Sequence, residues 1–238
     1  MLDDLGERAA EFAIELGTTL ATTLPQAPSV DVQAVEGRNT FIVQPSKPDG
    51  SLARVPLFVN GKRLAELSVQ LYLDSDWSGA FLKNVRTDCA AYSVLDKQPL
   101  FRLDYRADMH SAPVSHWQFH AERGSLTHLL TLAQDHRPKS VDAPHVLSRL
   151  HFPVGGERFR PCIEDVIQFV IEECGVDSIQ GWRSVVDEGR ERWRRIQLRT
   201  AVRDLQREAA DTLVREGWTV APPSDKEIEE STKALTRW

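Results

Sequence analysis

Apolar positions near the start of the chain follow a helical period. Between Leu5 and Leu20 they recur at steps of three and four residues, which predicts an amphipathic helix that ends before Pro25. After this segment the pattern changes, and Phe41–Val43 forms a short apolar run typical of a strand.

A β-hairpin is predicted over residues 55–73. Apolar side chains alternate at 55–59 and again at 67–73, on either side of the dipeptide Asn60-Gly61. A type I′ turn needs positive φ at both central positions, and Asn followed by Gly meets that need at little cost. The two runs are therefore expected to pair as antiparallel strands.

The next part of the chain reads as a loop followed by a meander. Residues 74–88 are rich in Asp, Ser and Asn, which predicts a loop. Strand patterns return at 92–95, 100–106 and 114–121, and their short connections favour antiparallel neighbours.

Helical patterns dominate the rest of the chain. One begins after Ser125, a stronger one runs from Pro161 to a stop at Gly175, and residues 182–216 are helical in character. The order of these elements predicts an α+β fold with an N-terminal helix, an antiparallel β-meander and a helical C-terminal region. We expect a core of residues 1–160, with 161–238 packed on it. The order also suits a layout like that of ubiquitin-conjugating enzymes, although no cysteine lies in such a context.

Composition narrows the class of protein. The chain is 41% hydrophobic and 27% charged, as in ordinary globular proteins, and its net charge of −6 disfavours a surface that binds nucleic acid everywhere. The three cysteines form no CxxC pair, so neither a disulfide framework nor a zinc knuckle is predicted. With no signal peptide and no apolar stretch of about 20 residues, we expect a cytoplasmic protein without a membrane segment.

The strands at 100–121 concentrate polar side chains on one side. Successive strand residues point to opposite faces, so Phe101, Leu103 and Tyr105 face away from their polar neighbours. If the two strands pair across the 107–113 loop, one face collects Arg102, Asp104, Arg106, His116, Gln118 and His120. All seven histidines of the chain lie between residues 110 and 151.

Three interpretations of this face stay open. The first interpretation is a metal site at His116 and His120. On a strand these two side chains are separated by about 13 Å, so one metal ion cannot bind both unless a bulge, or His110 and His151, completes the site. We predict no metal and no cofactor. In the second interpretation His116 and His120 act as base and acid, Arg102 and Arg106 hold a phosphate, and Asp104 orients a histidine. In the third, Asp104 pairs with a neighbouring Arg or His simply to solvate the sheet.

Two basic segments are further candidates for binding. Arg158 and Arg160 follow a glycine pair and precede a helix N-terminus, where anions are favoured, although an ordinary turn explains the same residues. The stretch 183–203 has seven Arg against three acidic residues, including Arg192 and Arg195, a local charge of +4. Its tryptophans, Trp182 and Trp193, could stack on bases or enter a partner's groove, or they could pack inward under a solvated helix face.

Residues 92–120, YSVLDKQPLFRLDYRADMHSAPVSHWQFH, resemble the TumE-type toxin family of bacterial toxin–antitoxin pairs. The shared features are a tyrosine-bearing strand, an Arg-x-Asp strand and a closing Pro/His-rich strand, matched by Arg102, Asp104, His110, His116 and His120. The resemblance implies a nucleic-acid-directed hydrolase, a toxin or defence component that cleaves phosphodiesters without metal. The alternative is a non-catalytic subunit that binds a partner through its Arg- and Trp-rich C-terminal helix. The partner is thus RNA or protein, and the oligomeric state stays open.

Overall fold

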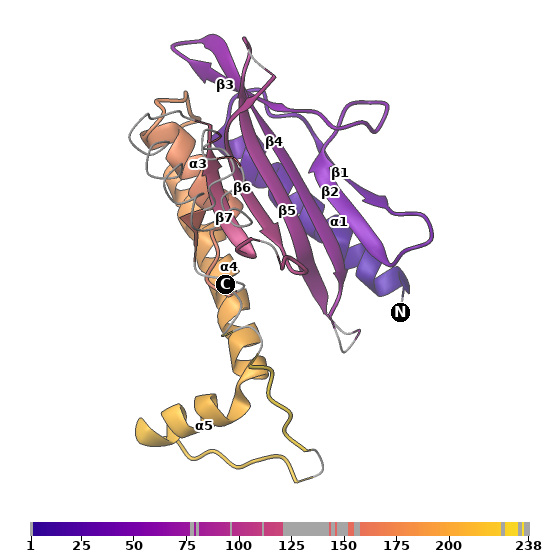
Figure 1. The fold of residues 1–238 in the computed structure, drawn as a ribbon, viewed down its shortest axis with the longest axis vertical. Helices are drawn as coiled ribbons and strands as arrows, with labels where there is room; N and C mark the ends of the chain where they lie inside the picture. The colour runs from indigo at the N-terminus through magenta and orange to yellow at the C-terminus, as the bar shows by residue number, and fades with distance from the viewer. Residues whose placement is uncertain are drawn as a thin grey trace.

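The computed structural model describes residues 2–76, 79, 81–95, 97–110, 112–120, 143, 146, 152–154, 158–224, 227–232 and 235. Within these residues the fold is α+β, with an N-terminal helix, an antiparallel sheet and C-terminal helices (Figure 1). The helices are α1 (Leu2–Thr23), α3 (Ile163–Glu172), α4 (Trp182–Asp204) and α5 (Gln206–Arg215). The strands are β1 (Val30–Ala34), β2 (Thr40–Pro45), β3 (Val55–Val59), β4 (Lys62–Ser75), β5 (Leu82–Ser93), β6 (Pro99–Arg106), β7 (Ser115–Phe119) and β8 (Phe152–Pro153).

The sheet has the order β1-β2-β4-β5-β6-β7-β8, with β3 paired to β4, and every pairing is antiparallel. The predicted hairpin is confirmed as β3 and β4. Asn60 and Gly61 have φ values of 50° and 72° at its turn, in the left-handed region that this turn requires. The long β4 pairs with β3 through its first part and with β2 through its second.

Two local predictions are wrong. Residues 74–88 are not one loop, because β4 continues to Ser75 and β5 already begins at Leu82. The polar residues of this stretch are used in the paired strands, as when Asp88 lies opposite Asp104. The strand expected at 92–95 is only the end of β5. The helical character expected of residues 182–216 is confirmed, as two helices, α4 and α5, that meet at Leu205, where φ is −133°. The helix expected after Ser125 lies outside the described residues.

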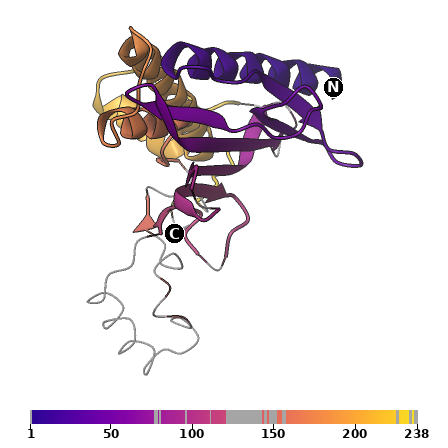
Figure 2. The ribbon, with the colours of Figure 1, turned by 90° about the horizontal axis from the view of Figure 1, so that it is seen from above.

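One face of the sheet is covered by α1, α3 and α4 (Figure 2). Leu67 and Val69 of β4 meet Leu20 of α1 and Ile167 of α3 there, all four with 0% exposure. Val186 of α4 belongs to the same core. Burial of such side chains is the main stabilising contribution to the fold.

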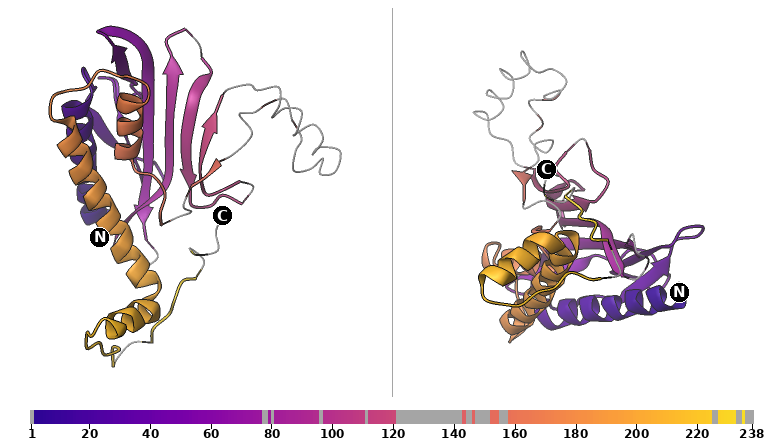
Figure 3. Two further views of the ribbon diagram at one scale, coloured as in Figure 1. Left: turned by 90° about the vertical axis from the view of Figure 1, so that its left-hand side faces the viewer. Right: turned by 90° about the horizontal axis from the view of Figure 1, so that it is seen from below.

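Helix α4 is held to the core by close packing and by an ion pair with α3. Gly189 faces the Glu164 side chain so closely that a Cβ at this position would clash with it. Arg190 contacts Asp165 of α3 at 2.8 Å. Further along, α4 continues beyond the sheet and turns into α5, which has no buried residue (Figures 1 and 3). No helix in the described part of the chain is long and apolar enough to cross a membrane.

Candidate functional site

The polar side chains predicted to share one sheet face do so. Strands β6 and β7 pair across residues 107–114, which places Asp104 opposite His116 and Arg102 opposite Gln118. On the other side of β6, β5 adds Arg86 opposite Arg106 and Asp88 opposite Asp104. We call this set, Arg86, Asp88, Arg102, Asp104, Arg106, His116 and Gln118, the polar face; it lies on the side of the sheet away from the helices.

Carboxylates of the polar face form ion pairs with their neighbours. Arg102 contacts Asp104 at 3.1 Å, and Arg86 contacts Asp88 at 2.5 Å. Asp104 is only 7% exposed. Burial raises the pKa of Asp104 above its ordinary value, more than the nearby Arg102 guanidinium lowers it. The Asp104–Arg102 contact is the one expected in the third interpretation, in which Asp104 pairs with a neighbouring residue simply to solvate the sheet face.

His116 is a buried neutral imidazole. His116 is only 2% exposed, and burial lowers the pKa of its imidazole below the ordinary value. Its Nδ1 lies 2.7 Å from the Pro113 carbonyl oxygen, so this nitrogen carries the proton and donates it to the carbonyl. The ring has the protonation state of a general base, but its surface is not open to a substrate.

His120 follows β7 and is partly buried. Its Nδ1 lies 2.9 Å from Gln98 Nε2, from which it accepts a hydrogen bond, and its Nε2 is shielded from solvent without a hydrogen-bond partner. Burial lowers the pKa of His120, as does the positive charge of Arg102. Within the described residues no group of three His, Cys, Asp or Glu side chains is arranged to hold a metal ion. His151, invoked in the metal interpretation, is outside the described residues.

The predicted anion-binding arginines before α3 have contacts within the fold. Arg158 forms an ion pair with Asp204 of α4 at 2.6 Å, with both side chains largely buried. Arg160 is 7% exposed and stacks on two rings, with its guanidinium carbon 3.8 Å from the Tyr105 ring centre and 4.9 Å from that of Trp193. Arg160 therefore connects α4 to β6 of the sheet, and Arg158 connects α4 to the segment before α3.

The predicted binding residues of α4 lie in different surroundings. Arg195 pairs with Glu191 on the same helix at 2.6 Å, and both are well exposed. Arg192 is exposed and forms no ion pair with another described residue. Trp182 packs against the core and Trp193 stacks on Arg160, so both tryptophans point inward rather than toward a free surface.

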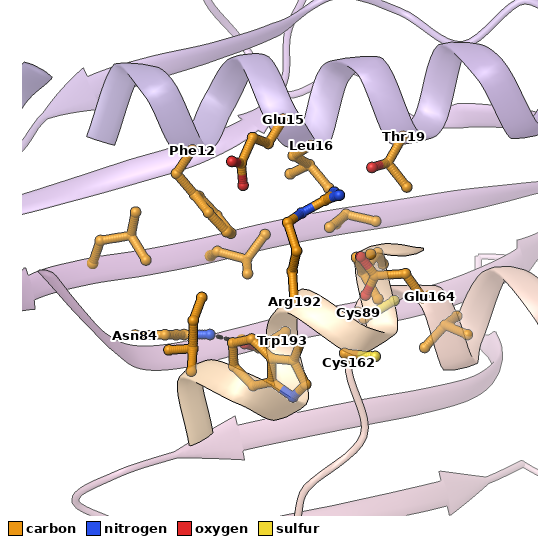
Figure 4. Close-up of a pocket in the computed structure, with 18 of the residues that line it drawn as sticks. Phe12, Glu15, Leu16, Thr19, Asn84, Cys89, Cys162, Glu164, Arg192 and Trp193 are labelled. Atoms are coloured by element: carbon orange, nitrogen blue, oxygen red, sulfur yellow. Dashed lines mark hydrogen bonds between the residues drawn. The ribbon is translucent and has the colours of Figure 1, made fainter. Parts of the chain in front are cut away.

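A cavity of about 320 Å³ was not anticipated from the sequence. It lies between α1, α4 and the apolar face of the sheet, and Arg160 and Arg192 are among its lining residues (Figure 4). Asn84 in its wall belongs to the stretch predicted as a loop. The structure thus places the candidate histidines on one face of the sheet, and Arg160 and Arg192 at a cavity on the opposite face.

Comparisons with protein-family models, with curated proteins and with solved structures give no match for this chain. The resemblance of residues 92–120 to TumE-type toxins therefore stays a prediction from those residues alone.

Proposed function

We propose that this protein acts through binding to other protein surfaces, and that its partner is a second copy of the same chain. The proposed surface is the outer side of α1 and α4, which contact each other on one face of the sheet (Figures 2 and 3). We call it the helical layer. Its charge distribution is the observation that supports the proposal.

Each of the two helices carries one row of like charges. Glu7, Glu11 and Glu15 recur at steps of four on α1 and form the acidic row. Arg192, Arg195 and Arg199 recur at steps of three and four on α4 and form the basic row. All six residues are exposed.

Most of these charges have no ionic partner within the chain. None of the three glutamates forms an ion pair with another described residue, and neither do Arg192 and Arg199. Arg195 pairs with Glu191, but both side chains are more than 60% exposed (66% and 63%), so that contact contributes little. The two rows remain available for intermolecular contact.

A two-fold axis through the helical layer would place each acidic row opposite the basic row of the other copy. Such self-complementary interfaces are the commonest kind in oligomers. Ile14 and Ile196 are 69% and 50% exposed beside the rows and would supply apolar contact. Opposed rows also give the contact its specificity, since a chain of net charge −6 otherwise repels its own copies.

A protein partner is favoured over RNA by the position of the aromatic residues. Base stacking on α4 would require free tryptophans, whereas Trp182 and Trp193 are engaged in the fold. Deleting α4 is not a clean test, because Val186 is fully buried in the common core. Surface substitutions leave that core intact and are the better experiment.

Charge reversal of one row at a time tests the proposal. The first variant combines Glu7→Lys with Glu11→Lys and so has two basic helices; the second combines Arg195→Glu with Arg199→Glu and has two acidic ones. Sedimentation velocity at low ionic strength, where charge contacts are least screened, should show a dimer for the unmodified chain and a monomer for each variant. An equimolar mixture of the two variants should restore the dimer, because every opposed row is then complementary.

A control variant, Glu36→Lys with Glu229→Lys, changes the net charge like the first variant but at exposed sites outside the helical layer. It should remain dimeric. A monomeric unmodified chain, or a mixture that stays monomeric, would refute the proposal. A dimer unaffected by either reversal would refute this interface.

Acid–base cleavage of RNA is the second candidate function. The observation in its favour is the register that places Asp104 opposite His116 on the face that also carries Arg102. The geometry supports it less well, because His116 is 2% exposed and Asp104 is engaged by Arg102. With a labelled single-stranded RNA in a chelating buffer, cleavage by the unmodified chain and its loss in His120→Ala at unchanged melting temperature would support it. Absence of cleavage, or full cleavage by His120→Ala, would refute it.

A further inference from the structure

The cavity between the sheet and the helices has the size of a small-molecule site and an apolar floor. Its volume of about 320 Å³ is within the range of ligand pockets. Residues of three neighbouring strands form the floor, with Phe12 and Leu16 of α1 above them (Figure 4). The floor residues are Val69, Leu71, Leu73, Leu82, Cys89 and Leu103. This floor suits a ligand with an apolar body.

The mouth of the cavity opens on the helical layer. Its exposed rim is shared with the proposed dimer contact and consists of Glu11, Glu15, Arg192 and Ile196. A second copy seated on the helical layer would therefore cover the mouth. The charges of Glu11 and Glu15 are balanced at the mouth by Arg8 and Arg192, so the mouth favours neither sign of charge. Selectivity for a ligand must come from groups deeper in the cavity.

Some polar groups in the wall are already engaged or out of reach. Asn84 is turned to this face by a β-bulge, where the pairing of β4 and β5 shifts between Tyr72 and Leu73. Its Nδ2 donates to Thr87 Oγ1 at 2.8 Å, and its Oδ1 is shielded from solvent. The guanidinium of Arg160 is stacked on two aromatic rings. The polar groups left for a ligand belong to α1 and α3.

Glu164 of α3 is a buried carboxylate in the cavity wall. It is 8% exposed and forms no ion pair with another described residue. Beside it lies the thiol of Cys162, a weak donor that stays neutral because burial raises its pKa, so the thiol does not balance the carboxylate charge. The Glu164 oxygens are not among the described side-chain atoms that are shielded from solvent without a partner, so a molecule in the cavity can reach them. Glutamate is almost never buried this deeply unless a cation accompanies it.

The fold makes room for this carboxylate. Gly189 of α4 faces Glu164 so closely that a Cβ at this position would clash with its side chain. Glycine in the interior of a helix is less favourable than alanine, yet α4 has glycine where Glu164 needs the space. The place of Glu164 in the wall is therefore set by packing against α4 and not by an ionic partner.

Thr19 of α1 adds a hydroxyl group to the same cavity. It is 4% exposed, and it lines the cavity with Glu164 (Figure 4). Thr18, Thr22 and Thr23 each donate a hydrogen bond to the carbonyl oxygen four residues earlier in α1. The Thr19 hydroxyl makes no hydrogen bond with another described residue, and its oxygen is likewise not shielded from solvent. It is available to a ligand.

We propose that the cavity binds a protonated primary amine with an apolar body, whose ammonium group meets Glu164 and Thr19. An ammonium group has three donors and no acceptor, which matches a carboxylate and a hydroxyl oxygen. Its hydrogen bond to a carboxylate is stronger than that of a neutral donor, so Glu164 distinguishes an amine from an alcohol of the same size. The apolar body lies on the floor formed by β4, β5 and β6. This site goes beyond the proposed dimer contact but shares its surface, so it is tested with the mouth open.

Naphthylmethylamine and naphthylmethanol are matched probes, since they share an apolar body and differ in the group that meets Glu164. Both are titrated at neutral pH, by probe fluorescence, into the full chain with Arg195→Glu and Arg199→Glu. These two changes keep the mouth uncovered and alter no cavity residue. The amine should bind at least about tenfold more tightly than the alcohol. In the same background Glu164→Gln, which removes the charge and keeps the shape, should abolish that preference by weakening the amine only, and Thr19→Val should weaken the amine in part.

Two matched controls separate this result from other causes. Glu173→Gln removes an exposed carboxylate just beyond α3, and Thr18→Val removes an exposed hydroxyl of α1. Neither residue lines the cavity, and both variants should leave the two affinities unchanged. Sedimentation of the unmodified chain judges the dimer contact separately, and the titrations judge the cavity whichever state it shows. Failure of the open-mouthed chain to bind the amine, equal affinities, or an amine preference that survives in Glu164→Gln would overturn the proposal.

Discussion

Replacing Asn84 with leucine is expected to stabilise the ligand-free protein. The substitution removes a shielded amide oxygen that has no hydrogen-bond partner, and such a group costs about 1–3 kcal/mol. It also removes the 2.8 Å hydrogen bond to Thr87, which contributes about 0.5–1.5 kcal/mol. Leucine is close to asparagine in shape and faces an apolar cavity. The net gain in unfolding free energy should be about 1 kcal/mol, or about 2–4 °C in Tm for a domain of this size.

Urea unfolding of Asn84→Leu, Thr87→Val and the double variant measures this balance. Thr87→Val alone removes the acceptor of the hydrogen bond and leaves the whole amide unsatisfied, so it should destabilise by about 1 kcal/mol. In the Asn84→Leu background the same change should cost almost nothing, because the amide is gone. If Asn84→Leu instead lowers stability by more than about 1 kcal/mol, the amide is satisfied in solution and the reasoning is refuted.

Three more predictions concern stability. Burial lowers the pKa of His116 in the folded protein, so on acidification this imidazole takes up a proton in the unfolded chain before it does so in the folded one. The unfolding free energy should therefore fall as the pH drops below about 6.5. In urea titrations His116→Asn should flatten this pH dependence, and an unchanged slope would contradict the prediction. Arg158→Ala leaves Asp204 largely buried and unpaired and should cost about 1–3 kcal/mol in the same assay, unless that ion pair is absent in solution. Arg195→Ala removes an exposed pair and should change stability by less than about 0.5 kcal/mol, and a larger loss would mean that Arg195 makes further contacts.

Features set by neighbouring residues could be predicted from the sequence. The turn at Asn60-Gly61 depends on two φ values that these residues adopt easily, and it forms as expected. The composition of the polar face follows from the alternation of side chains along β6 and β7. Once a short connection pairs these strands, Arg102, Asp104 and His116 must share a side.

Features set by contacts distant in the sequence could not be predicted. The alternation of side chains along β5 could not reveal the bulge that turns Asn84 toward the helices, because the bulge arises in the pairing of β5 with β4. Arg158 reads as an anion ligand before a helix, yet its partner is Asp204, 46 positions along the chain. The burial of His116 could not be predicted either, since alternation assigns a side chain to one face of the sheet without showing how deeply it is buried there.

The central claim is that the acidic and basic rows of the helical layer join two copies of this chain. The most direct measurement is sedimentation velocity on the two charge-reversed variants, each alone and then mixed in equal amounts. We predict monomers for each variant alone and a dimer for the mixture. A mixture that sediments as monomers, beside a dimeric unmodified chain, would contradict pairing of the rows and place the contact elsewhere.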